Sequence, residues 1–142
     1  MLIETVRVSA KARDELIRLK TKTRIENWNT LCRWAICHSL SVNIGEALPS
    51  IDHTTDSNVE MTWRTFAGRH EELYWALVVE RCRKDKLDAH NHEVVTQQFK
   101  LHLHRGIQYL SAIKDLTIDG LLAMGKEAIE KDGMESQLQF RV

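Results

Sequence analysis

The stretch Thr5-Val6-Arg7-Val8-Ser9 alternates polar and apolar side chains near the start of the chain. Successive side chains of a β-strand point to opposite faces, so the two valines would share one face and Arg7 would lie on the other. This pattern predicts a short strand whose valines cover a core and whose arginine points outward.

The residues that follow predict two amphipathic helices joined by a polar turn. The first helix begins at the N-cap Ser9 and runs to about residue 23, and the second spans about residues 27 or 29 to 40. In the first helix the apolar arc consists of Ala12, Leu16 and Leu19. A strand followed by two helices is the order found in ribbon-helix-helix DNA-binding proteins. By that analogy we expect two copies of the strand to pair across a dimer axis.

Basic side chains border the apolar arc of the first helix on both sides. One flank carries Lys11, Arg18 and Lys22, and the other carries Arg13, Lys20 and Arg24. Such flanks suit a helix that lies near a phosphate backbone. Solvated lysines beside an amphipathic helix look the same, so the flanks gain weight only together with the preceding strand.

Charge is unevenly distributed along a chain whose formal net charge is zero. Residues 1–38 carry eight Lys or Arg against four Asp or Glu, whereas residues 46–60 carry four acids and no Lys or Arg. Residues 115–135 carry six acids and two bases. Because salt screens charges beyond about 10 Å at ~0.1 M, the sign of each local patch matters more to a polyanion than the sum.

A length of 142 residues predicts a single domain with a substantial core. Within it we expect a basic module over 1–41, an acidic loop over 42–60 with the only proline, a helical remainder over 61–132 and a flexible tail over 133–142. Further helices are predicted over about 61–86, 93–114 and 118–131. The predicted fold class is therefore mainly α, with one short N-terminal strand and about five helices.

Two features predict that the chain assembles with copies of itself. A single strand has no pairing partner in its own chain, and an isolated strand is not stable. Four tryptophans, at positions 28, 34, 63 and 75, lie along helices that cannot all face one small core. We expect a homo-oligomer, with a tetramer favoured over a dimer.

Histidines and cysteines are the remaining candidates for chemistry. Two H-x-H pairs, at 90/92 and 102/104, hold four of the seven histidines. Side chains two residues apart on a helix point about 200° apart, so neither pair chelates a metal from that helix, and we expect surface or interface histidines. The spacing of the three cysteines does not suggest a disulfide framework. Cys32 lies on the apolar stripe of the second helix, so we expect its thiol to be buried.

Several classes of function lack support in the sequence. We find no glycine-rich phosphate loop, no Ser/His/Asp order and no paired-carboxylate signature, so we expect neither an enzyme nor a bound cofactor. No apolar run approaches the roughly 20 residues of a membrane span, and the N-terminus has no signal pattern. A cytoplasmic protein is expected.

A set of short stretches carries a resemblance through its order and spacing. They are Val6-Arg7-Val8-Ser9, Lys11-Ala12, Leu16-Ile17-Arg18-Leu19-Lys20, the segment from Thr30 to Leu40, Thr65-Phe66-Ala67-Gly68, Leu73-Tyr74-Trp75-Ala76-Leu77, His102-Leu103-His104-Arg105-Gly106-Ile107 and Tyr109-Leu110. Spread over about residues 4–112, they resemble the DndE family of bacterial DNA sulfur-modification proteins.

The resemblance implies a small accessory protein of the phosphorothioation machinery, which replaces a non-bridging phosphate oxygen of DNA by sulfur. It implies binding to duplex DNA, preferably nicked, and partnership with the iron–sulfur and ATPase-like members of that system. The resemblance assigns no catalytic residue to this chain. By position, the residues expected to contact phosphate are Arg7, Lys11, Arg18, Lys20, Lys22 and Arg33.

Two other interpretations stay open at this point. A ribbon-helix-helix transcription regulator would read an operator through Thr5 and Arg7 and would bind one palindromic sequence tightly. In a protein–protein scaffold the strand and the basic flanks would meet the acidic loop over 46–60 or a partner, and the protein would not bind DNA at physiological salt. Nicking activity has no catalytic signature behind it.

Overall fold

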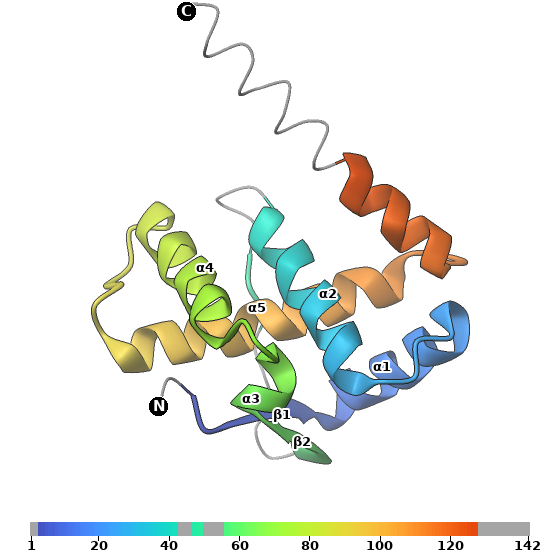
Figure 1. Cartoon of the computed structure of the whole chain (residues 1–142), viewed down its shortest axis with the longest axis horizontal. Helices are drawn as coiled ribbons and strands as arrows, with labels where there is room; N and C mark the ends of the chain where they lie inside the picture. Colours follow the sequence, from blue (N-terminus) through green and yellow to red (C-terminus); the bar gives the residue numbers. More distant parts are fainter. Residues whose placement is uncertain (1–2, 43–46, 50–55, 128–142) are drawn as a thin grey trace, which may run out of the picture.

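A computed structural model describes residues 3–42, 47–49 and 56–127 of the chain. The elements in order are β1 (Thr5–Ser9), α1 (Ala10–Thr23), α2 (Trp28–Ser41), β2 (Asp56–Thr62), α3 (Trp63–Ala67), α4 (Glu71–Lys84) and α5 (His92–Ala112). Residues 118–127 are also helical. The predicted fold class, mainly helical with a short N-terminal strand, is confirmed (Figure 1).

The first two elements follow the local sequence signals closely. Val6 and Val8 are buried and Arg7 is exposed, as the alternation predicts. The Ser9 hydroxyl accepts a hydrogen bond from the Ala12 N–H at 3.1 Å, which satisfies one of the free donors at the start of α1. At the other end, Arg24 takes a left-handed conformation with φ 62° and donates its N–H to the Lys20 carbonyl.

β1 pairs with a strand of its own chain. We had expected it to pair with the same strand of a second copy. β1 pairs antiparallel with β2, with Thr5 opposite Thr62 and Arg7 opposite Glu60. The two-stranded sheet lies at the bottom of the view in Figure 1. β2 occupies the end of the segment predicted as an acidic loop, so the need for an oligomer no longer follows from an unpaired strand.

The helix predicted over 61–86 is two helices. Gly68 lies between α3 and α4 with φ 62° and ψ −124°, a conformation that residues with a side chain rarely adopt. The predicted helix over 93–114 corresponds to α5. The predicted helix over 118–131 is described only as far as residue 127, and the proposed tail over 133–142 lies outside the described residues.

The core lies around α5, which runs across the molecule behind α2 in Figure 1. Phe99 of α5 meets Trp63 and Phe66 of α3 with ring centroids 5.1 and 5.2 Å apart, in edge-to-face contacts. His102 and His104 of α5, which we expected at a surface or interface, are only 1% and 9% exposed. Their position on the face that packs against α2 and the β1–α1 junction explains the difference.

Candidate nucleic-acid interface

Three of the predicted phosphate contacts form a row along α1. Lys11, Arg18 and Lys22 fall within about 40° of one another because a helix turns 100° per residue, and the row is about 16 Å long. The first two side chains are exposed and the third is half-buried. All three lie on one flank of the buried stripe, as the sequence predicts.

A buried carboxylate lies between the first two cations of this row. Burial raises the pKa of Glu15, and the positive charges of Lys11 and Arg18 oppose that shift. Glu15 is on the buried side of α1, whereas the two cations are exposed. The carboxylate therefore lies on the buried side of the helix and does not stand between the two cations and a ligand.

The end of the row is tethered to another helix. Lys22 donates from Nζ to the carbonyl of Ser111 at 3.4 Å, near the end of α5. The C-terminal carbonyls of a helix carry partial negative charge, so an ammonium there is favourable. An ammonium has three N–H donors, and this contact uses one of them.

Lys20 lies on the opposite flank of α1. Its Nζ stands 3.6 Å from the ring centroid of Trp28, at the start of α2, in a cation–π contact. Arg13 lies on the same flank and is exposed. The structure therefore does not bring Lys20 into the row formed by Lys11, Arg18 and Lys22.

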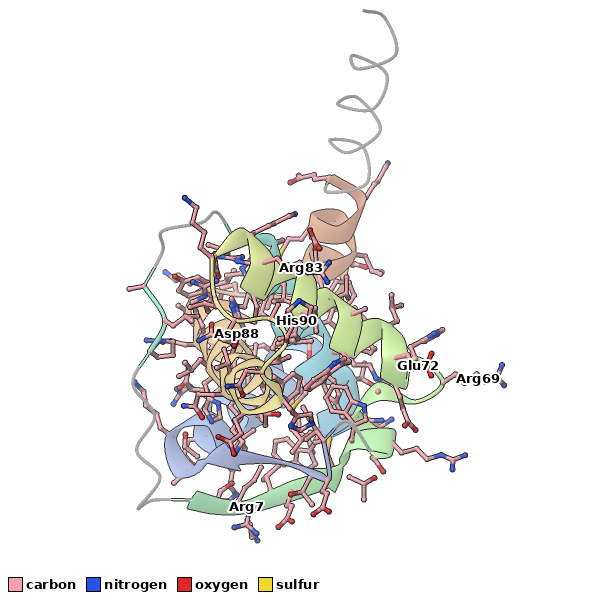
Figure 2. The ribbon with its side chains drawn as sticks, turned by 90° about the vertical axis from the view of Figure 1, so that its left-hand side faces the viewer. Arg7, Arg69, Glu72, Arg83, Asp88 and His90 are labelled. Atoms are coloured by element: carbon pink, nitrogen blue, oxygen red, sulfur yellow. The ribbon has the colours of Figure 1, made fainter. Side chains whose placement is uncertain are left out.

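Arg7 projects from the outer face of the sheet, at the lower edge of the molecule in Figure 2. Its guanidinium forms an ion pair with the carboxylate of Glu60, the residue directly opposite on β2. Both side chains are substantially exposed, so the pair contributes only about 0–1 kcal/mol to stability. Glu60 was not among the predicted site residues, because position 60 was predicted to lie in a loop.

Arg33 has a structural task in this fold. Its guanidinium donates to the carbonyls of Thr65, at 3.2 Å, and Phe66, which belong to the last turn of α3. Asn29, one turn earlier on α2, also donates to the Thr65 carbonyl at 3.2 Å. Arg33 thus joins α2 to α3 and lies apart from the row on α1.

Comparison with known proteins identifies the family. The family model described as DNA sulphur modification protein DndE matches residues 5–117. The chain belongs to the DndE family. The resemblance found in the sequence is confirmed, and the match covers every element from β1 to α5.

Solved structures show the same fold. The crystal structure of DndE from Escherichia coli B7A, involved in DNA phosphorothioation modification, has 20% identity and a TM-score of 0.60, covering 78% of this chain and 98% of that one. A mutant DndE in which two glycines are replaced by lysine, involved in DNA phosphorothioation, has 16% identity and a TM-score of 0.54, covering 78% and 100%. A search of curated proteins found no match.

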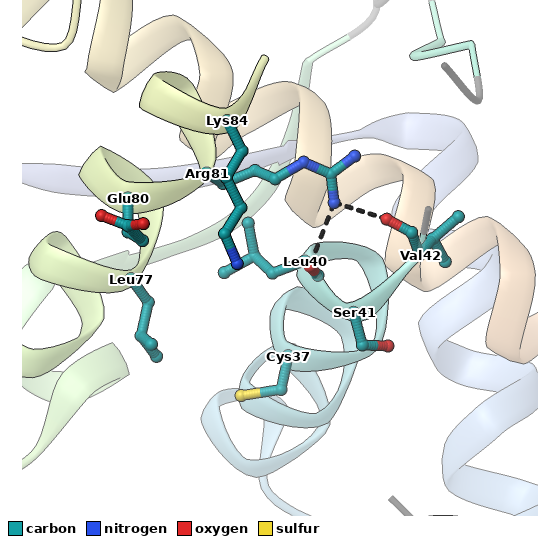
Figure 3. A pocket seen from close by; sticks show the side chains of 8 residues that line it. All are labelled: Cys37, Leu40, Ser41, Val42, Leu77, Glu80, Arg81 and Lys84. Carbon is teal, nitrogen blue, oxygen red and sulfur yellow. Dashed lines mark hydrogen bonds between the residues drawn. The ribbon is translucent and has the colours of Figure 1, made fainter. Parts of the chain in front are cut away.

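In this DndE-family chain a second cluster of polar groups holds the end of α2. Arg105 of α5 is 1% exposed and donates to the carbonyl and the hydroxyl of Ser39, each at 2.8 Å. Arg81 of α4 donates to the carbonyls of Leu40, at 3.0 Å, and Val42, at 2.6 Å (Figure 3). Two guanidinium groups thus satisfy carbonyls at the negative end of the helix dipole.

His102 belongs to the same cluster and is held neutral. Its Nδ1 lies 2.9 Å from the Ser39 hydroxyl, and burial, followed by the charge of Arg105, lowers the pKa of His102 to about 4. Because Arg105 donates to the Ser39 hydroxyl, that hydroxyl can donate in turn to Nδ1, which leaves the ring proton on Nε2. The cluster is a structural support for α2.

Metal and thiol chemistry find little support in the described residues. Within that part of the chain no group of three or more His, Cys, Asp or Glu is placed to hold a metal ion. Cys32 is buried, as predicted, and burial raises its pKa to about 12. Among the described helices, none is long and apolar enough to cross a membrane.

Proposed function

We propose that this DndE-family chain is a DNA-binding accessory protein of the phosphorothioation machinery. The observation that supports it best is the row of Lys11, Arg18 and Lys22 on one flank of α1. Each strand of duplex DNA carries one phosphate per about 3.4 Å of the helix axis, so a row of about 16 Å laid along that axis spans roughly five phosphates of one strand. Contacts of this kind give affinity and salt dependence without selecting a sequence.

Other cations extend this surface to different degrees. Arg7 on the sheet and Lys20 on the opposite flank of α1 are the further cations we include, although Arg7 shares its charge with Glu60. Arg33 is left out of the proposed interface because its donors hold the last carbonyls of α3. The proposal includes the preference for nicked duplex that the family resemblance implies, since a nick lowers the cost of bending DNA onto a protein surface.

We also propose that the chain forms a homo-oligomer, with a tetramer favoured over a dimer. Exposed apolar side chains support it: Leu73 on α4 is 52% exposed, and Leu122 on the helix 118–127 is 58% exposed. Each has an exposed apolar neighbour four residues away, Leu77 and Ile118 respectively, so each helix presents an apolar stripe. Light scattering that gave about 16.5 kDa at micromolar concentration would exclude assembly.

Within this proposal the chain has no catalytic step of its own and binds no cofactor. It works in the cytoplasm, where DNA is, and delivers or holds DNA for the iron–sulfur and ATPase-like members of the system. The transcription-regulator interpretation loses its main support, because β1 pairs within the chain and Arg7 faces a carboxylate instead of an open groove. The scaffold interpretation predicts no DNA binding, so the same experiment separates the two.

The test is a salt-titrated binding assay on intact, nicked and single-stranded DNA of random sequence. Wild type is compared with a Lys11/Arg18/Lys22→Ala variant and with an Arg64/Arg69/Lys84→Ala control, which removes the same charge from exposed positions on α3, the following turn and α4. We expect the first variant to lose affinity and to lower the salt slope by about two to three units, and the control to retain both. Absence of DNA binding by folded wild type near ~0.15 M salt would favour the scaffold.

A further inference from the structure

A polar groove lies on the flank of α1 that faces away from the Lys11 row. It has a volume of about 610 Å³ and is walled by α1, the start of α2 and β2. Trp28 forms an aromatic wall, and Lys20 lies over its ring. None of the contacts described for the row on α1 uses this groove.

We propose that this groove binds an unpaired nucleobase of DNA. Trp28 is half-buried and lines the groove, so its ring is held in place while it remains accessible. Stacking of a base on an aromatic side chain works for every base, because each has a π face. Lys20 covers one face of the ring, with its Nζ 3.6 Å from the ring centroid, so a base stacks on that face only by displacing the ammonium.

Three asparagines surround the aromatic wall and supply groups that can read a base edge. Asn27 is the N-cap of α2, yet its side chain makes no capping hydrogen bond. Asn58 is exposed on β2 and lines the same groove. Asn29 uses its amide N–H on the Thr65 carbonyl, which leaves its carbonyl oxygen as an acceptor. Amide side chains form paired hydrogen bonds with adenine, so adenine is the base we expect to fit best.

The charge of the groove favours a base over a phosphate. Arg13 and Lys20 contribute two positive charges, and Glu26 and Glu60 contribute two negative charges, of which that of Glu60 is paired with Arg7. A phosphate gains little from such a balanced site, whereas a neutral planar group with donors and acceptors meets partners of both kinds.

The groove and the row lie on opposite flanks of one helix, about 10 Å across. A single strand whose phosphates contact Lys11 and Arg18 would cross α1 over Ile17, which is 41% exposed, and place a base against Trp28. Phosphates would thus be held on one flank and an unstacked base on the other. This inference rests on the proposed DNA-binding function and adds a base-binding site to it.

The test compares two 12-nucleotide probes that carry the same number of phosphates, an oligo(dA) and an abasic oligonucleotide. We expect wild type to bind oligo(dA) about tenfold more tightly than the abasic probe. Trp28→Leu should abolish that difference and leave affinity for the abasic probe unchanged. Trp75→Leu, a half-buried tryptophan on α4, is the matched control and should keep the difference.

An Asn27/Asn58→Ala variant keeps the test decisive if Trp28→Leu does not fold, because both side chains are exposed and Asn27 makes no capping hydrogen bond. It should reduce the preference for oligo(dA) severalfold. Equal binding of both probes by wild type, or a preference that survives the groove variants, would overturn the inference while duplex binding upheld the proposed function. Failure of wild type to bind duplex or either probe would overturn both.

Discussion

Gly106 of α5 meets the backbone of Ala35 where α2 crosses α5. A Cβ atom on Gly106 would lie 1.8 Å from the Ala35 carbonyl oxygen and 2.4 Å from its carbonyl carbon. The obstacle is backbone, which cannot turn aside as a flexible side chain does. The absence of a side chain at Gly106 therefore allows the two central helices to touch.

Replacement of Gly106 by alanine should destabilise the fold by about 1–3 kcal/mol or more, because the helices must separate along a well-packed core. Urea denaturation followed by circular dichroism measures the loss as a lower midpoint. Gly125→Ala is the control, since its Cβ would meet only the Trp34 ring at 3.7 Å, an ordinary contact. The control should be neutral or stabilising by up to about 1 kcal/mol, from better helix propensity. A Gly106→Ala protein within 1 kcal/mol of wild type would contradict the close crossing.

The neutral state of His102 should make stability depend on pH. The folded pKa is about 4 and the ordinary value is 6.5, so between these values the unfolded chain binds the proton and the folded chain does not. Stability is then fully present above pH 6.5 and falls with decreasing pH by up to about 1.4 kcal/mol per unit, roughly 3 kcal/mol in all, until about pH 4.

His102→Asn should reduce the slope of the unfolding free energy against pH by the contribution of one proton, because Asn does not titrate. Urea titrations at several pH values between 4 and 7 give the slope for each protein. His90→Asn replaces an exposed histidine and is the control for the histidine-to-asparagine change itself. An unchanged slope in His102→Asn would mean that His102 is protonated in the folded protein as readily as in the unfolded one.

The N-terminal elements were predictable because their signals are local. The alternation and the cap at Ser9 require no knowledge of distant residues. The alternation appears in the fold over residues 5–8 and the cap appears as expected, whereas Ser9 is buried after a register shift in the sheet. β2 was missed because Val59 and Met61 are its only apolar residues, and its pairing with β1 spans about fifty residues of sequence. The alternation of Asn58, Glu60 and Thr62 with those two residues was the one available signal.

The candidate site was predictable only in part, for a similar reason. Helical periodicity alone places Lys11, Arg18 and Lys22 on one flank. The contacts of Arg33 with α3 and of Arg7 with Glu60 join residues more than thirty positions apart, which no periodicity reveals. The buried positions of His102 and His104 likewise depend on how α5 packs against α2 and β1.

The role of Arg33 can be separated from DNA contact. Arg33→Gln should lower stability by about 1–3 kcal/mol, because the Thr65 and Phe66 carbonyls lose a charged donor. The salt slope of DNA binding by the folded variant should stay at the wild-type value. Arg64→Gln, at an exposed position of α3, is the control for charge and should leave stability unchanged. A salt slope reduced by about one unit in Arg33→Gln would instead place Arg33 at the phosphates.

If the chain binds DNA as proposed, the ion pair between Arg7 and Glu60 should lower its affinity for duplex DNA. Glu60→Gln removes the carboxylate charge that faces Arg7 and should tighten duplex binding up to about fivefold at low salt, at little cost in stability because the pair is exposed. The salt slope should steepen by about one unit as Arg7 gains a phosphate partner, and the gain should fade at high salt. Glu72→Gln makes the same charge change on α4, where Figure 2 shows Glu72 beside Arg69 and away from Arg7, and should give a much smaller gain. Equal tightening by the two variants would show that only net charge matters and that Arg7 lies outside the interface.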